Sequence, residues 1–284
     1  MFYIILAILT STAIIVTFRI FERFGISIVQ AITINYLVAS VFGFLSETGN
    51  FSFSAIPDQP WFLSALVVGA LLIISFNFFA FSAQYSGISI TAISSRMSVV
   101  MPVALGFLIF NDPVNIFKIT GIVLALIAFY LTSKKDKNII VNPKYAWLPV
   151  LLFVAVGTND SMFKIAEHFY IGGDFVVFLA TAFGVALFLG LAVLLIKRIE
   201  SKEKFAVKNL IAGIILGLLN WFSTLYFLKG LDIFDVSVFV PLYNIGVVAL
   251  SAIIGFLVFK EKLTKLNWLG ISLAVIAIFL IAKF

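Results

Sequence analysis

The chain has 284 residues, of which 63% are hydrophobic and 11% are charged, and its formal net charge is +6. A soluble domain usually carries about a quarter charged residues, so this composition excludes a water-exposed globule. With no cysteine and a single histidine, the chain can form neither disulfides nor a zinc site built on several thiolates or imidazoles. The composition is typical of an integral membrane protein, whose basic residues set its orientation rather than bind nucleic acid.

Ten apolar segments follow one another along the chain, each of a length suited to crossing a bilayer core of about 30 Å. They are expected at residues 2–18, 26–45, 61–84, 88–110, 115–132, 146–168, 174–196, 208–228, 233–258 and 266–282. A transmembrane barrel would show alternating segments of about 10 residues instead. The first segment has no basic residue before Arg19 and no small-residue cleavage site, so it is expected to be a transmembrane helix rather than a signal peptide. The prediction is an all-α integral membrane protein with ten transmembrane helices.

Matching sequences recur about half a chain length apart and in the same order. The pairs are "FRIFERF" (18–24) with "FKIAEHF" (163–169), "SFNFF" (75–79) with "LLNWF" (218–222), and "GIVLALIAFYL" (121–131) with "GISLAVIAIFL" (270–280). They predict a duplication, with residues 1–143 as a first five-helix repeat and residues 144–284 as a second. Because five is odd, the second repeat enters the membrane from the opposite side. Inverted repeats of this kind are a recurring construction of secondary transporters.

The first of these matches is charged, but its charges fall at helix ends, where bases and Glu can pair at the membrane interface. It therefore marks the register of the duplication, and a gating role is a second reading. Most of the 19 lysines and arginines lie in connections after odd-numbered segments. The opposite side carries Lys118, Lys164, Lys229 and Lys283. The positive-inside rule then places both termini outside the cytoplasm.

Strongly polar side chains lie near the middle of most of the apolar segments. A polar group at this depth is costly unless it is paired, so each is a candidate substrate contact. These residues are Asn35, Asn77, Arg96, Asn159, Asp160, Asn220 and Asn244. Trp221 and Tyr243 each adjoin such an asparagine and combine an aromatic ring with a polar group. The alternative for the asparagines is a bridge between helices.

Two segments lack such residues and carry pairs of small residues instead. Gly121 with Ala125, and Gly270 with Ala274, are spaced as small-xxx-small pairs, which suit close helix packing. The predicted arrangement is therefore eight helices around a polar centre, with 115–132 and 266–282 as support.

Arg96 lies in "ITAISSRMSVVMP" (90–102), where serines and threonines could bond its guanidinium. One interpretation is contact with a carboxylate or other anionic group of a substrate, because a guanidinium presents a planar fork of donors. The other is a structural salt bridge to Asp160. Asp160 itself could hold a cationic group of the substrate or a coupling proton.

Prolines occur in corresponding segments of the two repeats. Pro102 is expected to interrupt segment 88–110, and Pro241 to interrupt segment 233–258. Each removes a helix hydrogen bond, which is tolerable where protein or a wet cavity satisfies the freed carbonyl. Paired interruptions point to a transporter's binding site or gate, whereas the alternative is a kink that serves packing alone.

Several of these features resemble the drug/metabolite transporter superfamily, and within it the EamA-type permeases. The resemblance rests on "FKEKLTKLNWLGISLAVIAIFLI" (259–281), with Glu261 and Gly270, and on the related "FNDPVNIFKITGIVLALIAFYL" (110–131), with Asp112 and Gly121. It implies ten helices in two inverted repeats, and transport of a small solute.

The chain also departs from the pattern of this superfamily. Many relatives have Trp-Gly in the middle of the first helix, where this chain has "TST" (10–12), and an arginine in the second helix, where it has Asn35. Arg96 is a candidate to take over that charge. Relatives usually have cytoplasmic termini, in conflict with the charge distribution above, so the orientation stays open.

The expected function is secondary active transport of a small polar, amino-acid-like metabolite, in the direction of export, across the cytoplasmic (inner) membrane by alternating access. The nucleotide-binding pattern G-x-x-x-x-G-K-[ST] does not occur, so a gradient must supply the energy. An uptake carrier for a sugar, nucleoside or other metabolite is the alternative. A channel and an intramembrane enzyme are weaker ones, since no nucleophile–base pair or metal cluster is recognisable.

No catalytic residue, metal or cofactor is expected. The expected partners are a small-molecule substrate, membrane lipid and a coupling proton or cation, with no nucleic acid, in a monomer or homodimer. The sequence leaves open the identity of the solute, the direction of transport, the coupling ion and the oligomeric state.

Overall fold

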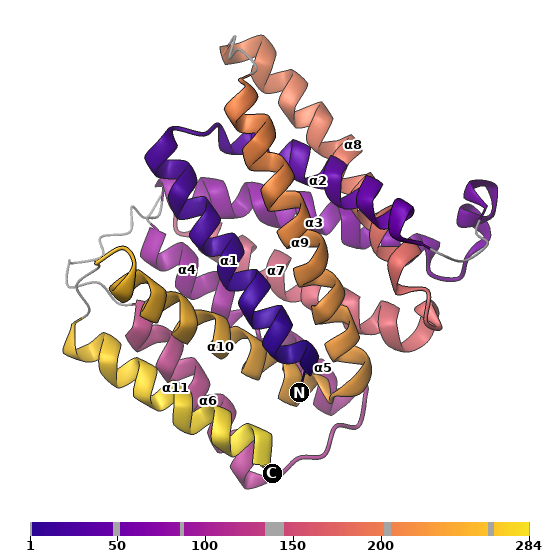
Figure 1. The fold of residues 1–284 in the computed structure, drawn as a ribbon. Coiled ribbons are helices and arrows are strands. Elements are labelled where there is room, and N and C mark those ends of the chain that lie inside the picture. Colours follow the sequence, from indigo (N-terminus) through magenta and orange to yellow (C-terminus); the bar gives the residue numbers. More distant parts are fainter. Residues whose placement is uncertain are drawn as a thin grey trace. The chain divides into compact units, whose positions relative to one another are not determined.

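The computed structural model describes residues 2–47, 52–85, 88–133, 145–201, 206–260 and 264–283 (Figure 1). Within these ranges all regular secondary structure is helical, which confirms the all-α prediction. The helices are α1 (Phe2–Phe24), α2 (Ile28–Ser46), η1 (Phe53–Asp58), α3 (Phe62–Tyr85), α4 (Ile88–Met97), α5 (Val100–Leu108), α6 (Ile116–Ser133), α7 (Trp147–Ala166), η3 (Glu167–Ile171), α8 (Phe175–Ser201), α9 (Val207–Ile233), α10 (Val236–Leu257) and α11 (Lys265–Lys283). Glu261, part of the resemblance, lies outside the described residues.

Six helical spans are long and apolar enough to cross a membrane by length and composition. They are Ile28–Ser46, Phe62–Phe79, Trp147–Ile171, Phe175–Ala192, Val207–Ile233 and Val236–Leu257. Shorter apolar helical stretches cover Phe2–Phe18, Ser94–Leu108, Ile116–Thr132 and Lys265–Ile281. Together these stretches fall on the ten apolar segments expected from the sequence.

The segment expected at 88–110 is divided into two helices. α4 ends at Met97 and α5 begins at Val100, with a turn at Ser98 and Val99 between them. Pro102 therefore lies in the first turn of α5, where a missing N–H costs little because that turn has no internal acceptor for it. The break falls just before the proline, directly after Arg96.

Pro241 does not have the same effect, and the expectation that it interrupts its helix was wrong. α10 runs without a break from Val236 to Leu257, with Pro241 inside it. Pro241 is the sixth residue of α10, beyond the first turn, so it removes one internal hydrogen bond, and it is buried, so that packing around it can offset this loss. The lost bond is the one that would join residue 241 to the carbonyl of Ser237.

The described chain divides into two compact units, and each unit draws on both halves of the sequence. Unit 1 comprises residues 1–73 and 165–232, and unit 2 comprises residues 74–164 and 233–284. The chain passes from one unit to the other within α3, near the end of α7 and at the end of α9. This division concerns spatial contacts, whereas the predicted repeats at 1–143 and 144–284 concern sequence.

In unit 1, α2 packs along α8 and lies deep inside the unit. Every residue of α2 from Gln30 to Tyr36 is buried, whichever way its side chain points. α9 approaches α2 closely, because an ideal Cβ at Gly213 would lie 2.5 Å from Ile34 and one at Gly217 would lie 2.7 Å from Val38. This stretch of α2 is therefore enclosed on all sides, whereas Leu37, Val41 and Leu45 further along the helix are exposed.

In unit 2, α10 contacts α5, α6 and α11, and α6 lies alongside α11 (Figure 1). An ideal Cβ at Gly121 would lie 2.6 Å from Ile281, and one at Gly270 would lie 2.5 Å from Thr132. The start of α6 thus meets the end of α11, and the two helices are antiparallel. This close approach confirms the packing role predicted for the small residues.

The pattern "FKIAEHF" (163–169) coincides with a change of helix type. α7 continues without a break into η3, a π-helical turn, which ends at Gly172 and Gly173 with φ of 55° and 104°. Positive φ at two successive residues favours glycine, which has no Cβ to clash. The chain passes from unit 2 to unit 1 between Lys164 and Ile165, inside this pattern.

Candidate functional site

Arg96 and Asn244 form the centre of the polar interior of unit 2. Arg96 occupies the last turn of α4, and its Nη1 donates a 2.9 Å hydrogen bond to Asn244 Oδ1 on α10. Asn244 Nδ2 donates in turn to the carbonyl of Val240 at 3.0 Å, so the amide is held with its oxygen toward the guanidinium. The carboxyl end of a helix carries partial negative charge, which favours a cation there.

Asp160, on α7, belongs to the same group. Its carboxyl interacts electrostatically with Arg96, although the guanidinium makes its hydrogen bond to Asn244. α7 is also close to α5 here, since an ideal Cβ at Gly157 would contact the Met101 side chain. The neighbouring Asn159 is 8% exposed, and its buried Oδ1 accepts no hydrogen bond from the described residues.

Two of the hydroxyl groups that could bond Arg96 bond other groups instead. Ser98 Oγ donates to the carbonyl of Ser95 at 2.6 Å, and Thr91 Oγ1 shares a 2.7 Å hydrogen bond with Ser82 Oγ. A guanidinium has five N–H donors. Within the part of the chain that the structure describes, Asn244 takes one of them, which leaves donors for a further anionic group.

Two other predicted residues, Tyr243 and Asn77, also lie in unit 2. Tyr243 is half-buried and its ring stacks on Phe239, with centroids 6.1 Å apart and planes at 9°. Asn77 is half-buried on the part of α3 that belongs to unit 2.

The remaining candidates lie in unit 1. Asn35, on α2, is 3% exposed, and its Oδ1 accepts no hydrogen bond from any described residue. Asn220, on α9, accepts a 2.9 Å hydrogen bond at its carbonyl from Thr224 Oγ1. Trp221 is 1% exposed and packs edge-on against Phe42, so in this structure it is a core side chain.

The "TST" sequence of the first helix also lies in unit 1. Ser11 Oγ and Ser223 Oγ share a buried 2.5 Å hydrogen bond that joins α1 to α9. Thr12 is 1% exposed, and its Oγ1 has no hydrogen-bond partner in the described ranges. Of the three hydroxyls of this sequence, that of Ser11 is the one shown to link α1 to α9 in the described residues.

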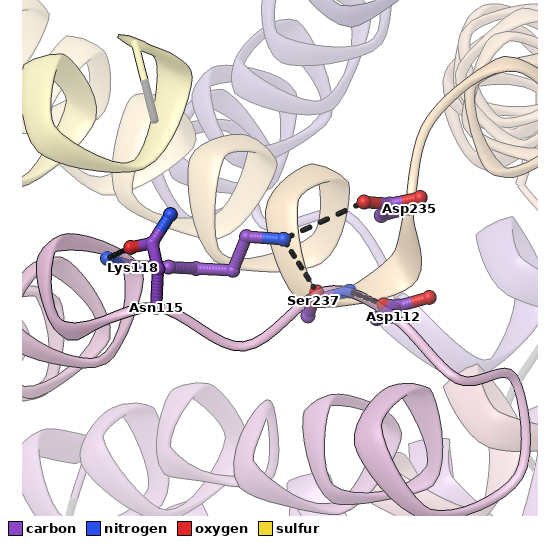
Figure 2. Close-up of polar contacts among 5 residues, drawn as sticks. All are labelled: Asp112, Asn115, Lys118, Asp235 and Ser237. Atoms are coloured by element: carbon purple, nitrogen blue, oxygen red, sulfur yellow. Dashed lines mark hydrogen bonds and ion pairs between the residues drawn. The ribbon is translucent and has the colours of Figure 1, made fainter.

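Sequence reasoning missed a charged group at the start of α10 (Figure 2). Lys118 was counted among the lysines of a membrane face, but it is 1% exposed and its Nζ lies 3.4 Å from Asp235 Oδ2 and 3.5 Å from Ser237 Oγ. Asp112 Oδ2 accepts a 2.8 Å hydrogen bond from the backbone N–H of Ser237. The one sequence signal near this group is Asn115, a polar residue directly before an apolar run, which is typical of the start of a helix.

Lys164 is another basic residue that the count of lysines and arginines placed at a membrane face. It is 8% exposed, and its Nζ lies 5.5 Å from the centre of the Phe110 ring, within the range of a cation–π interaction. The described residues contain no group of three or more His, Cys, Asp or Glu side chains that could hold a metal ion.

The helical architecture and its interior charges define a multi-pass membrane protein. The chain belongs to the EamA-like transporter family, whose model matches residues 143–283. It is 33% identical, over 97% of its own length and 96% of the relative's, to an uncharacterized protein of Haemophilus influenzae. A crystal structure of another protein shares the fold, with a TM-score of 0.80, 10% sequence identity, and coverage of 98% of this chain and 94% of that one.

Membership of this family confirms the resemblance seen in the sequence. The protein is a membrane transporter of small solutes, and its family consists of transporters rather than enzymes. The shared fold extends over nearly the whole chain.

Proposed function

We propose that the protein is a secondary carrier that exports a small, amino-acid-like solute across the cytoplasmic membrane by alternating access. The observation that carries this proposal is the group formed by Arg96, Asn244 and Asp160 inside unit 2. Arg96 and Asp160 are both half-buried, and no direct hydrogen bond between them is seen in the described residues. A cation and a carboxylate so placed suit a solute that carries both charges. A neutral solute would need neither.

Each residue of this group has a distinct role in the proposal. Arg96 holds the carboxylate of the solute through its free donors, because a guanidinium matches a carboxylate in a bidentate geometry. Asp160 holds the cationic group, or a coupling proton or cation when the solute is absent. Asn244 keeps the guanidinium oriented, since its own amide is fixed by the Val240 carbonyl.

The inverted repeat is part of the proposal, and helix pairing supports it. Helices in equivalent positions of the two sequence halves pack against each other: α2 with α8, α5 with α10 and α6 with α11. Elements close to a two-fold axis contact their own equivalents, as isologous interfaces do. Two repeats related in this way can expose a central site to one side of the membrane and then to the other.

The proposed carrier also has an expected energy source and expected partners. The energy comes from an ion gradient, with a proton or another cation as the coupling ion, and the carrier works in lipid as a monomer or homodimer. The candidate contacts outside the central group are Asn35, Asn77, Asn159, Asn220 and Tyr243. Unpartnered buried oxygens at Asn35 and Asn159 are suited to accept hydrogen bonds from a solute's donors.

The test is a thermal-shift screen of the purified protein with a library of amino acids, sugars and nucleosides, followed by flux of each hit into liposomes. We expect hits among zwitterions, with saturable counterflow. Arg96→Ala should abolish flux of the hit, whereas the matched variant Arg23→Ala, at the end of α1, should retain it. Hits confined to neutral sugars or nucleosides, or wild-type flux in Arg96→Ala, would contradict the proposal.

A further inference from the structure

The first turn of α10 is held by two side chains from the other side of unit 2 (Figure 2). Asp112 provides a tight contact, since its Oδ2 lies 2.8 Å from the backbone nitrogen of Ser237. It is also enclosed, because an ideal Cβ at Gly106 would lie only 2.5 Å from the same oxygen. Asp112 thus acts as a fixed cap, which satisfies one of the free N–H groups at the helix start.

Lys118 provides a much looser contact to the same turn. Its Nζ lies 3.4 Å from Asp235 Oδ2 and 3.5 Å from Ser237 Oγ. Good hydrogen bonds between ionised groups are about 2.7–2.9 Å long. The Lys118 side chain is 2% exposed, whereas that of Asp235 is 44% exposed. A buried ammonium is therefore paired with a carboxylate that is partly exposed.

This arrangement is suited to release. A buried cation depends on its partner, because an unpaired charge in a protein interior is strongly destabilising. Lysine also has a long apolar stem that allows its ammonium to reach the membrane interface. Lys118 lies in the first turn of α6, near a helix end, so an exposed position is close to the buried one.

α10 connects this turn to the candidate site. Ser237 and Asn244 lie two helical turns apart, about 10 Å along the axis, and therefore on the same face. Pro241 lies between them and cannot donate to the Ser237 carbonyl, so the first turn is joined to the rest of the helix by fewer hydrogen bonds. The rings of Phe234, Phe239 and Tyr243 stack in series along this stretch, at 6.3 and 6.1 Å.

We propose that Lys118 is a positioning residue for the Arg96 site, and that its ion pair with Asp235 is a latch on the first turn of α10. With the latch closed, α10 holds Asn244 against Arg96 in the geometry described above. When the latch opens, the first turn moves at Pro241 and the Asn244 amide shifts relative to the guanidinium. This inference rests on the proposed function for its part in transport, but the latch itself can be tested without a solute.

Because the sequence contains no cysteine, a single introduced thiol can be labelled without background from native residues. Val236→Cys and Ile245→Cys each introduce one thiol at a position that is 0% exposed, before and after Pro241. The measurement is the rate of reaction with a soluble maleimide in proteoliposomes. Each reporter is combined with Lys118→Met, with Asp235→Asn, and with the charge exchange Lys118→Asp plus Asp235→Lys. Lys229→Met, which removes a lysine of unit 1, is the matched control.

We expect Lys118→Met and Asp235→Asn each to raise labelling of Val236→Cys about tenfold, because opening the turn no longer breaks an ion pair. Labelling of Ile245→Cys should rise by a smaller factor, and the charge exchange should return both rates toward those of the single-cysteine protein. Lys229→Met should leave both unchanged.

Each other outcome overturns part or all of the inference. Equal rates with and without Lys118 would show that there is no latch. A rise at Val236→Cys with none at Ile245→Cys would show that the latch does not reach the site. A rise that the charge exchange fails to reverse would show a packing role for Lys118 rather than an ion pair. A solute screen without hits would leave these three labelling results interpretable. The proposed carrier function and the proposed latch can therefore fail independently.

Discussion

Arg96 and Asn244 are joined by a 2.9 Å hydrogen bond although 148 positions separate them in the sequence. The amide of Asn244 cannot turn over without losing its second bond, from Nδ2 to the Val240 carbonyl. The orientation of Asn244 Oδ1 toward the guanidinium is therefore fixed by α10 itself. A neutral acceptor at this place orients Arg96 without cancelling its charge.

The substitution Asn244→Asp would cancel the charge of Arg96. The new carboxylate would lie opposite the guanidinium and occupy the donors that an anionic group needs. We expect flux of a zwitterionic hit to fall by at least about tenfold, equivalent to about 1.4 kcal/mol. The new ion pair offsets part of the stability lost with the Nδ2 bond to the Val240 carbonyl. Asn244→Ala is the control: it lowers the unfolding temperature, because it removes the acceptor of a half-buried charged donor, Arg96. Wild-type flux in Asn244→Asp would contradict the role given to Arg96.

Asp112 is expected to stabilise the protein rather than to take part in transport directly. Asp112→Ala leaves the N–H of Ser237 without its acceptor and should lower the free energy of unfolding by about 1–2 kcal/mol. Asp112→Asn keeps an acceptor oxygen at the same place and should cost less than half as much. The measurement is chemical unfolding in detergent. Equal losses in the two variants would show that the charge of Asp112, rather than its hydrogen bond, stabilises the turn.

The sequence predicted those features that depend on local composition and spacing. The helical class follows from apolar runs, and the close approach of α6 to α11 follows from Gly121 and Gly270, because small residues at regular spacing have one main use between helices. The sequence also suggested that Arg96 and Asp160 form a salt bridge; the structure shows an electrostatic interaction between them, while Arg96 donates its hydrogen bond to Asn244.

The features that the sequence did not predict depend on distant partners. Lys118 looked like a membrane-face lysine, because its partner Asp235 lies 117 positions further on. Asn244 could not be assigned to Arg96 for the same reason. Pro241 was expected to break its helix, but a proline near the first turn removes one hydrogen bond, which surrounding packing can compensate. Trp221 was singled out for its polar group, yet its ring fills the core beside Gly43.

The hydrogen bond between Ser11 and Ser223 gives a prediction for unit 1. It is buried, and it joins α1 to α9 at 2.5 Å. In a double-mutant cycle with Ser11→Ala and Ser223→Ala, we expect a coupling free energy of about 0.5–1.5 kcal/mol, the range found for hydrogen bonds between membrane helices. The same cycle on Ser52 and Ser54, whose hydrogen bond is exposed, should give a coupling near zero. Indistinguishable couplings would mean that burial adds nothing to the bond between α1 and α9.

Gly270 and Gly190 provide a matched pair for the packing of α6 against α11. An ideal Cβ at Gly270 would lie 2.5 Å from Thr132 Oγ1 and 2.7 Å from the Thr132 nitrogen, whereas one at Gly190 would have no neighbour closer than 3.7 Å. The backbone of Thr132 cannot yield without moving α6. The same stretch of α6 is also tied to α11 by Asn267 Nδ2, which donates to the carbonyls of Leu131 and Thr132 at 3.0 and 2.9 Å.

Gly270→Ala should therefore reduce the free energy of unfolding by about 1–3 kcal/mol, the usual cost of overpacking. Gly190→Ala should leave it unchanged or raise it by up to about 1 kcal/mol, because alanine restricts the unfolded chain at a helical position. Both values come from unfolding in detergent, followed by helical circular dichroism. If Gly270→Ala were as stable as Gly190→Ala, α6 and α11 could separate by a few tenths of an ångström without loss. Their contact would then depend on Asn267 more than on the small residues.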